Sequence, residues 1–165
     1  MTEELHDSLI HLLVQRLDST VAAAAMVDWA TAALCAGLDS PALVILAGLP
    51  RASILSDAEP WFEKTLDQLG IKLPSADDIR RAYVGVVSRA ILAGTSETAD
   101  ALELIHRHVV SPLGHPSDLQ PWCFVWEGLA PSDFHRLNAG EIERETMTLA
   151  NVWAQQAPIV RMATA

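Results

Sequence analysis

Hydrophobic side chains along this chain recur at the spacing of α-helices and not at the alternating spacing of strands. Near the N-terminus, one amphipathic stripe is formed by Leu5, Leu9, Leu12, Leu13 and Leu17. A second stripe contains Ile79, Tyr83, Val86, Val87 and Ala90. No run shows sustained apolar and polar alternation. The pattern therefore predicts an all-α protein.

Residues that typically start and stop helices divide this pattern into short elements. Ser40 and Pro41 have the order of an N-cap followed by a proline in the first turn, whereas Gly37 and Gly70 mark helix ends. Asp57 is expected to cap the helix that follows it. The expected helices cover approximately residues 5–17, 20–36, 41–46, 57–70, 75–94, 96–112, 117–126 and 139–156. We expect residues 1–165 to form a single compact bundle of about seven or eight helices with orthogonal or irregular packing.

The segment from Ser19 to Pro50 is apolar enough to require a test against a membrane span. Its only charged residues are Asp28 and Asp39. A carboxylate in the middle of a span is costly, so a buried central helix around Asp28 explains the segment better. We expect Asp28 to lie at an exposed edge or in an ion pair, and the alternative is a pocket. The N-terminal residues show no secretory signal, which predicts a cytoplasmic protein without membrane association.

The chain is strongly acidic, with a formal net charge of −10 and a pI near 4.8. Residues 1–70 hold ten acidic and three basic side chains, so most of the excess lies in the first half. Such a surface is repelled by phosphate backbones, which argues against nucleic-acid binding. It favours solubility and attracts a partner protein with a basic surface.

Three of the six histidines lie in ELIHRHVVSPLGHP, from Glu103 to Pro116. His106, His115 and Glu103 are the candidates for a metal or small-molecule site. On an α-helix, His106 and His108 point to opposite sides, because residues two apart do not face each other. His115 follows a proline and a glycine in a loop. We therefore expect His115 not to meet a helical histidine, and we expect no metal and no cofactor.

The remaining chemistry of the chain does not suggest an enzyme. It contains neither a G-x-S-x-G motif nor a glycine-rich phosphate loop. Cys35 and Cys123, the only cysteines, lie in apolar surroundings in which free cysteine usually acts as a small hydrophobe. We expect no catalytic residues.

Two tryptophans lie four residues apart in the segment PWCFVW. This spacing places Trp122 and Trp126 on one helix face. Burial in the core is the favoured interpretation, because tryptophan buries a large apolar area. The alternative is an interaction surface, since tryptophan is enriched at binding hot spots.

The segment from Trp29 to Leu49, WATAALCAGLDSPALVILAGL, resembles a family of small soluble bacterial proteins. Their shared pattern is W-A followed by L-x-x-G-x-D-S-P-x-L-x-x-L-A-G-L, with an acidic helix further along that ends as DQLGI does here. The resemblance covers about half of the chain and implies a bacterial cytoplasmic protein of all-helical fold. The family is uncharacterised, so no activity, cofactor or site residue transfers from it.

Three hypotheses for function remain at this stage. The first is protein–protein interaction, in an adaptor or immunity role, with a partner that has a basic surface. The second is a small-molecule or metal pocket that uses His106, His115 and Glu103. The third is a structural homo-oligomer in which the tryptophan face is buried against a second copy.

Overall fold

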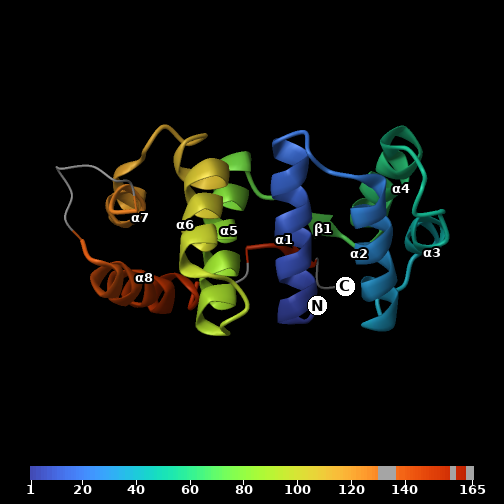
Figure 1. Cartoon of the computed structure of the whole chain (residues 1–165). Coiled ribbons are helices and arrows are strands. Elements are labelled where there is room, and N and C mark those ends of the chain that lie inside the picture. Colours follow the sequence, from blue (N-terminus) through green and yellow to red (C-terminus); the bar gives the residue numbers. More distant parts are fainter. Residues whose placement is uncertain (130–136, 157–158, 163–165) are drawn as a thin grey trace. The chain divides into compact units, whose positions relative to one another are not determined.

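The computed structural model describes residues 1–129, 137–156 and 159–162, with the backbone alone at 161 and 162. The described chain is all-α and contains eight α-helices (Figure 1). They are α1 (Glu3–Leu17), α2 (Ala23–Cys35), α3 (Pro41–Ala47), α4 (Leu55–Gln68), α5 (Ala76–Leu92), α6 (Thr98–Ile105), α7 (Gln120–Glu127) and α8 (Ala139–Trp153). A π-helical turn (His106–Val110) follows α6, and a 3₁₀ turn (Ser117–Leu119) precedes α7. Two short strands, β1 (Ile71–Lys72) and β2 (Arg161–Met162), pair antiparallel.

The all-α prediction is confirmed, and each expected helix has a counterpart. Gly37 and Gly70, which were expected to end helices, adopt φ values of 83° and 62°. This left-handed conformation is easy for glycine and typical of a residue just past a helix end. The expected role of Asp57 is wrong, because α4 begins at Leu55 and Ile54 occupies the N-cap position without a side-chain hydrogen bond. Asp57 lies in the first turn, where its charge faces the positive end of the helix dipole.

The β1–β2 pair was not predicted from the sequence. Each strand contains two residues, and a two-residue strand is too short to produce a detectable alternation of apolar and polar positions. In β1 the first residue, Ile71, is buried and the second, Lys72, is exposed.

The helices form two compact units. The N-terminal unit contains Met1–Ile79 together with β2, and the C-terminal unit runs from Arg80 to Ala157. Each unit has its own buried apolar side chains. The expectation that residues 1–165 form a single domain stays a prediction.

The core of the N-terminal unit lies among α1, α2, α3 and α4, which contact one another in sequence order, with an additional contact of α2 with α4. Trp29 packs edge to face against Phe62, with ring centroids 5.5 Å apart. Both rings are buried. The apolar composition of α2 predicted a helix that is buried on all sides, but one face of α2 is exposed. Its exposed face carries small or polar side chains: Asp28, Thr31, Ala32, Cys35 and Ala36.

The C-terminal unit is built around α6, the π-helical turn, α7 and α8. Helix α7 contacts both α6 and α8, and it also packs against the π-helical turn. The largest fully buried side chain here is Trp122, which is 1% exposed. The expectation that Trp122 belongs to the core is therefore confirmed. Its neighbours in the core of this unit include Leu102, Ile105, Val109 and Leu119.

No helix in the described part of the chain is both long enough and apolar enough to span a membrane. The apolar segment that raised the question is divided between α2 and α3. The turn at Asp39 and Ser40 separates them, as the sequence pattern indicated.

The cap at the start of α3 provides a test of this local structure. The backbone N–H of Leu43 donates to Ser40 Oγ at 3.2 Å, and Pro41 occupies the first turn. Ser40→Ala should lower the free energy of unfolding by about 1 kcal/mol, because the Leu43 N–H loses its acceptor. Urea unfolding followed by circular dichroism measures this change.

The matched control is Ser56→Ala, since Ser56 lies exposed in the first turn of α4. A Ser40→Ala variant no less stable than this control would show that the cap contributes nothing measurable.

Candidate functional site

The histidine-rich segment does not end as an ordinary α-helix. After Ile105 the chain widens into the π-helical turn, and the N–H of Ser111 donates to the carbonyl of His106 at 2.9 Å. Insertions of this kind re-aim side chains and are frequent at functional sites. His108 turns its ring edge-on to Tyr83, whereas His106 faces Trp126. The expectation that these two histidines point to different sides is confirmed.

The loop after this turn brings His115 back to His106. Gly114 and His115 both adopt left-handed backbone conformations, with φ of 71° and 57°, and the N–H of His115 donates to the carbonyl of Val110 at 3.0 Å. The chain therefore reverses, and the two imidazole rings lie 5.8 Å apart between centroids. The expectation that they do not meet is wrong, because it ignored the direction that two successive left-handed residues impose on the loop.

A stacked pair of rings lies at the centre of this region. The imidazole of His106 lies parallel to the indole of Trp126, with centroids 3.5 Å apart and an interplanar angle of 1°. Trp126 Nε1 donates to Glu103 Oε2 at 3.1 Å, and Arg107 Nη2 donates to Glu103 Oε1 at 2.8 Å. The hydrogen bond from Trp126, followed by Arg107, holds the pKa of Glu103 below its usual range. Glu103 is thus a charged acceptor that fixes the orientation of the Trp126 indole against the ring of His106.

A thiol completes the group, which we call the histidine–cysteine cluster: Glu103, His106, His115, Cys123 and Trp126. Cys123 Sγ lies 3.8 Å from His115 Nδ1. Burial, and next the charge of Glu127, raise the pKa of Cys123, so its thiol stays protonated. Because the thiolate is the nucleophilic form, this pair is not an activated catalytic dyad.

The cluster joins three residues predicted as candidates for a metal or small-molecule site with Trp126, predicted as a core or interaction residue, and with Cys123. Glu103, His106 and His115 come together as a potential site requires, whereas Cys123 was interpreted as a simple core residue. The sequence did contain a signal for this contact: Cys123 precedes Trp126 by three residues, and residues three apart share a helix face. Among the described residues, no three His, Cys, Asp or Glu side chains are gathered closely enough to hold a metal ion.

The tryptophan face considered for self-association is largely covered within this unit. Trp122 is buried in the core, and Trp126 is covered on one side by His106. The large apolar side chains that remain exposed in the C-terminal unit include Leu92, Phe124, Leu129 and Met147. The hypothesis of a homo-oligomer stays a prediction, and any such contact would use side chains other than Trp122.

Asp28 lies on the exposed face of α2, as the preferred interpretation held. Its Oδ2 accepts a hydrogen bond from Arg51 Nη2 at 2.8 Å, and the two side chains are 50% and 72% exposed. Cys35, on the same helix, is exposed and not packed as a small hydrophobe. Neither residue belongs to the histidine–cysteine cluster.

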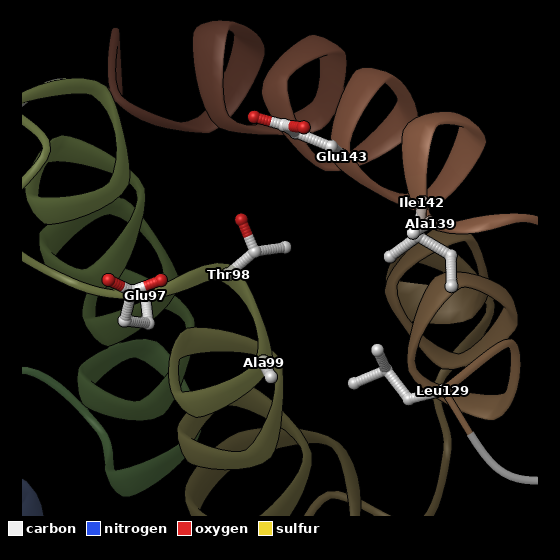
Figure 2. Close-up of a pocket in the computed structure, with 7 residues that line it drawn as sticks. All are labelled: Glu97, Thr98, Ala99, Leu129, Ala139, Ile142 and Glu143. Carbon is white, nitrogen blue, oxygen red and sulfur yellow. The ribbon is translucent and has the colours of Figure 1, made fainter.

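A second feature of the C-terminal unit is a hollow of about 300 Å³, shown in Figure 2. It lies between the start of α6, the start of α8 and the segment after α7. Figure 2 shows the polar side chains of Glu97 and Thr98 at the start of α6 opposite the apolar side chains of Leu129 and Ile142, with Glu143 on α8 above them. The complete lining is Glu97, Thr98, Ala99, Leu129, Ala139, Ile142 and Glu143.

Two carboxylates at this hollow are available to a ligand. Glu97 and Glu143 are exposed, and neither carboxylate forms an ion pair or hydrogen bond within the described residues. Glu141, two residues before Glu143, is instead committed to the capping box of α8, in which it exchanges hydrogen bonds with Asn138. Sequence reasoning missed the hollow, because it combines residues from separate helix starts with no shared motif.

Comparisons with known proteins give no match to this chain among protein-family models, curated proteins or solved structures.

The surface ion pair of Asp28 gives a stability prediction. Asp28→Asn should change the free energy of unfolding by less than about 0.5 kcal/mol, because exposed ion pairs are well solvated in both states. Urea unfolding measures this change, with Arg51→Gln as the matched variant. A loss of more than about 2 kcal/mol would mean that Asp28 has a buried structural role.

The environment of His106 gives a prediction for pH dependence. Burial and the nearby His115 lower the pKa of His106 below its ordinary value of 6.5, against the opposing effect of Glu103 and Glu127. Protonation therefore favours the unfolded state, and stability should be lost as pH falls from 6.5 towards the folded pKa. Urea unfolding at about pH 7.5 and about pH 5 should show a smaller loss in His106→Gln than in the wild type.

The pKa itself is measured by NMR titration of the imidazole. In Trp126→Ala, water reaches the ring and the His106 pKa should rise towards 6.5. A wild-type midpoint at or above 6.5 would contradict the assignment.

Proposed function

We propose that this chain is a protein-binding module that receives a basic side chain of a partner protein in the hollow between α6 and α8. One observation carries the proposal. Two carboxylates that have no ion pair within the described residues, Glu97 and Glu143, line the same hollow as the apolar side chains of Leu129 and Ile142. The hollow therefore presents both negative charge and apolar surface to a ligand.

Lysine and arginine side chains match this division. Each has a hydrocarbon stem that packs on apolar surface and a charged head that seeks water or a carboxylate. A volume of about 300 Å³ is sufficient for one such side chain. Arginine is the better match, because its planar guanidinium donates to carboxylates in fixed, paired geometry.

The charge of the whole chain supports the same class of partner. A net charge of −10 attracts a basic protein surface and raises the rate of encounter, whereas a nucleic acid is repelled. The starts of α6 and α8 add to this negative charge locally, since Asp100, Glu141 and Glu145 lie near Glu97 and Glu143 in sequence. An adaptor or immunity role in a bacterial cytoplasm fits such a module.

The test uses a short capped peptide with a central arginine between leucines, compared with the same peptide carrying glutamine. Binding is followed by NMR through the methyl signals of Leu129 and Ile142. The arginine peptide should shift these signals, and the effect should weaken at high salt because the attraction is between exposed charges. The glutamine peptide should bind at least about tenfold more weakly, because a charge-assisted contact contributes more than 1.4 kcal/mol.

The double variant Glu97→Gln/Glu143→Gln should abolish the difference between the two peptides. Its matched control is Asp100→Asn/Glu145→Gln, which makes the same change of charge on the same two helices at residues that do not line the hollow. If both double variants lose the same amount of arginine-peptide binding, the binding depends on the overall negative charge of the chain and not on the hollow. Unperturbed methyl signals at millimolar arginine peptide would refute the hollow as the binding site.

A further inference from the structure

Among the helices that the structure describes, α3 alone carries no polar or charged side chain. Its sequence is PALVILA, and its inner face is buried through Ala42, Leu43 and Leu46. The outer face is apolar as well, yet Val44 is 52% exposed and Ile45 is 41% exposed. A helix that is apolar all round is normally buried on all sides. The outer face of α3 is therefore an apolar surface that nothing in the described part of the chain covers.

The exposed residues of α3 follow the spacing of one helix face. Pro41, Val44, Ile45 and, at the C-cap, Gly48 are exposed and are spaced i, i+3, i+4 and i+7. Ile54, at the N-cap of α4, is 65% exposed and continues the apolar character beyond α3. Single exposed apolar side chains are common, whereas several on one face are typical of interaction sites. We call the surface of Pro41, Val44 and Ile45 the α3 face.

Negative charge gathers at the start of the α3 face. The N–H of Ala42 donates to Gln68 Oε1 at 2.9 Å, so the end of α4 lies against the start of α3. Asp67 precedes Gln68, and Asp39 precedes the N-cap residue of α3. Both aspartates are exposed, and neither carboxylate forms an ion pair or hydrogen bond within the described residues. An apolar helix surface thus has two available carboxylates at one of its ends.

We propose that the α3 face binds an amphipathic helix of a partner protein. The apolar stripe of that helix covers Val44 and Ile45, and its lysine or arginine side chains lie near Asp39 and Asp67. Such a helix supplies apolar side chains at the same i, i+3 and i+4 spacing, so the ridges of the two helices can interdigitate. The α3 face belongs to the N-terminal unit, whereas the hollow belongs to the C-terminal unit, so the proposal does not rest on the hollow.

Charge selects this occupant over a second copy or a membrane. Residues 1–70 hold ten acidic and three basic side chains, so two copies of this unit would bring like charges together. An anionic lipid surface is repelled for the same reason. In the loop after α3, Arg51 is paired with Asp28, which leaves that end of the face without net charge. The cationic side chains of the partner are therefore expected at the start of α3.

The test uses a capped amphipathic peptide with leucines spaced i, i+3, i+4 and i+7 and with lysines at one end of that stripe. A comparison peptide carries glutamates in place of the lysines. Binding to the full chain is followed by NMR through the methyl signals of Val44 and Ile45. The lysine peptide should shift both signals, and the glutamate peptide should bind at least about tenfold more weakly, because its charges are repelled.

Calorimetry measures the affinity of variants that alter the apolar surface. Val44→Gln/Ile45→Gln should weaken binding of the lysine peptide at least about tenfold, because these side chains supply the central apolar contact. Both are exposed, so urea unfolding should show a stability close to that of the wild type. The matched control is Met147→Gln/Val152→Gln, which changes two exposed apolar side chains of α8 and should bind as the wild type does.

A second pair of variants tests the charges. Asp39→Asn/Asp67→Asn should reduce the preference for the lysine peptide over the glutamate peptide, because the carboxylates at the start of α3 are lost. Asp57→Asn/Asp77→Asn makes the same change of charge at two other exposed residues of the N-terminal unit and should keep the preference. Equal effects of the two variants would overturn the placement of the cationic side chains.

Other results would overturn the proposal as a whole. One is the absence of any shift of the Val44 and Ile45 methyl signals at millimolar lysine peptide. A dimer in sedimentation that Val44→Gln/Ile45→Gln abolishes would assign the α3 face to a second copy. Binding to phosphatidylcholine vesicles that the same variant abolishes would assign it to a membrane. Glu97→Gln/Glu143→Gln should leave binding at the α3 face unchanged, so a failure of the hollow is observed separately.

Discussion

Burial of one apolar face is the interaction on which each helix of this protein depends. The helices range from seven residues in α3 to 17 in α5, and isolated helices of such lengths are marginal in water. Helix α3 persists because Leu43 and Leu46 are fully buried, and α7 persists because Trp122 is. The polar residues of the candidate sites lie on the margins of these buried faces, so the core determines where they point.

The histidine–cysteine cluster shows how a local departure from regular helix geometry creates a site. The π-helical turn directs His106 onto Trp126, and the left-handed pair at Gly114 and His115 returns the chain to the same place. A left-handed histidine is conformationally costly. The cost is offset by contacts that this conformation allows, including the hydrogen bond that the His115 N–H donates to the carbonyl of Val110 and the approach of the His115 ring to His106.

Helix α6 connects the two candidate sites, because the hollow lies at its first residues and the cluster begins at Glu103 near its end. Eight helical residues span about 12 Å. The chemistry at the two ends differs. Exposed carboxylates at the hollow act through charge and are weakened by salt, whereas a buried thiol facing an imidazole acts through directed bonds. The acidic composition therefore bears on the hollow far more than on the cluster.

The sequence by itself determined the fold class, the helix positions and the Ser40 cap, because these depend on local periodicity and on caps that a few adjacent residues form. It also placed His106 and His108 on different sides. It did not determine the contact between His106 and His115, the place of Cys123 or the hollow at Glu97 and Glu143. Those depend on loop direction and on the packing of separate helices. No periodic pattern encodes such contacts, and only the tertiary structure decides them.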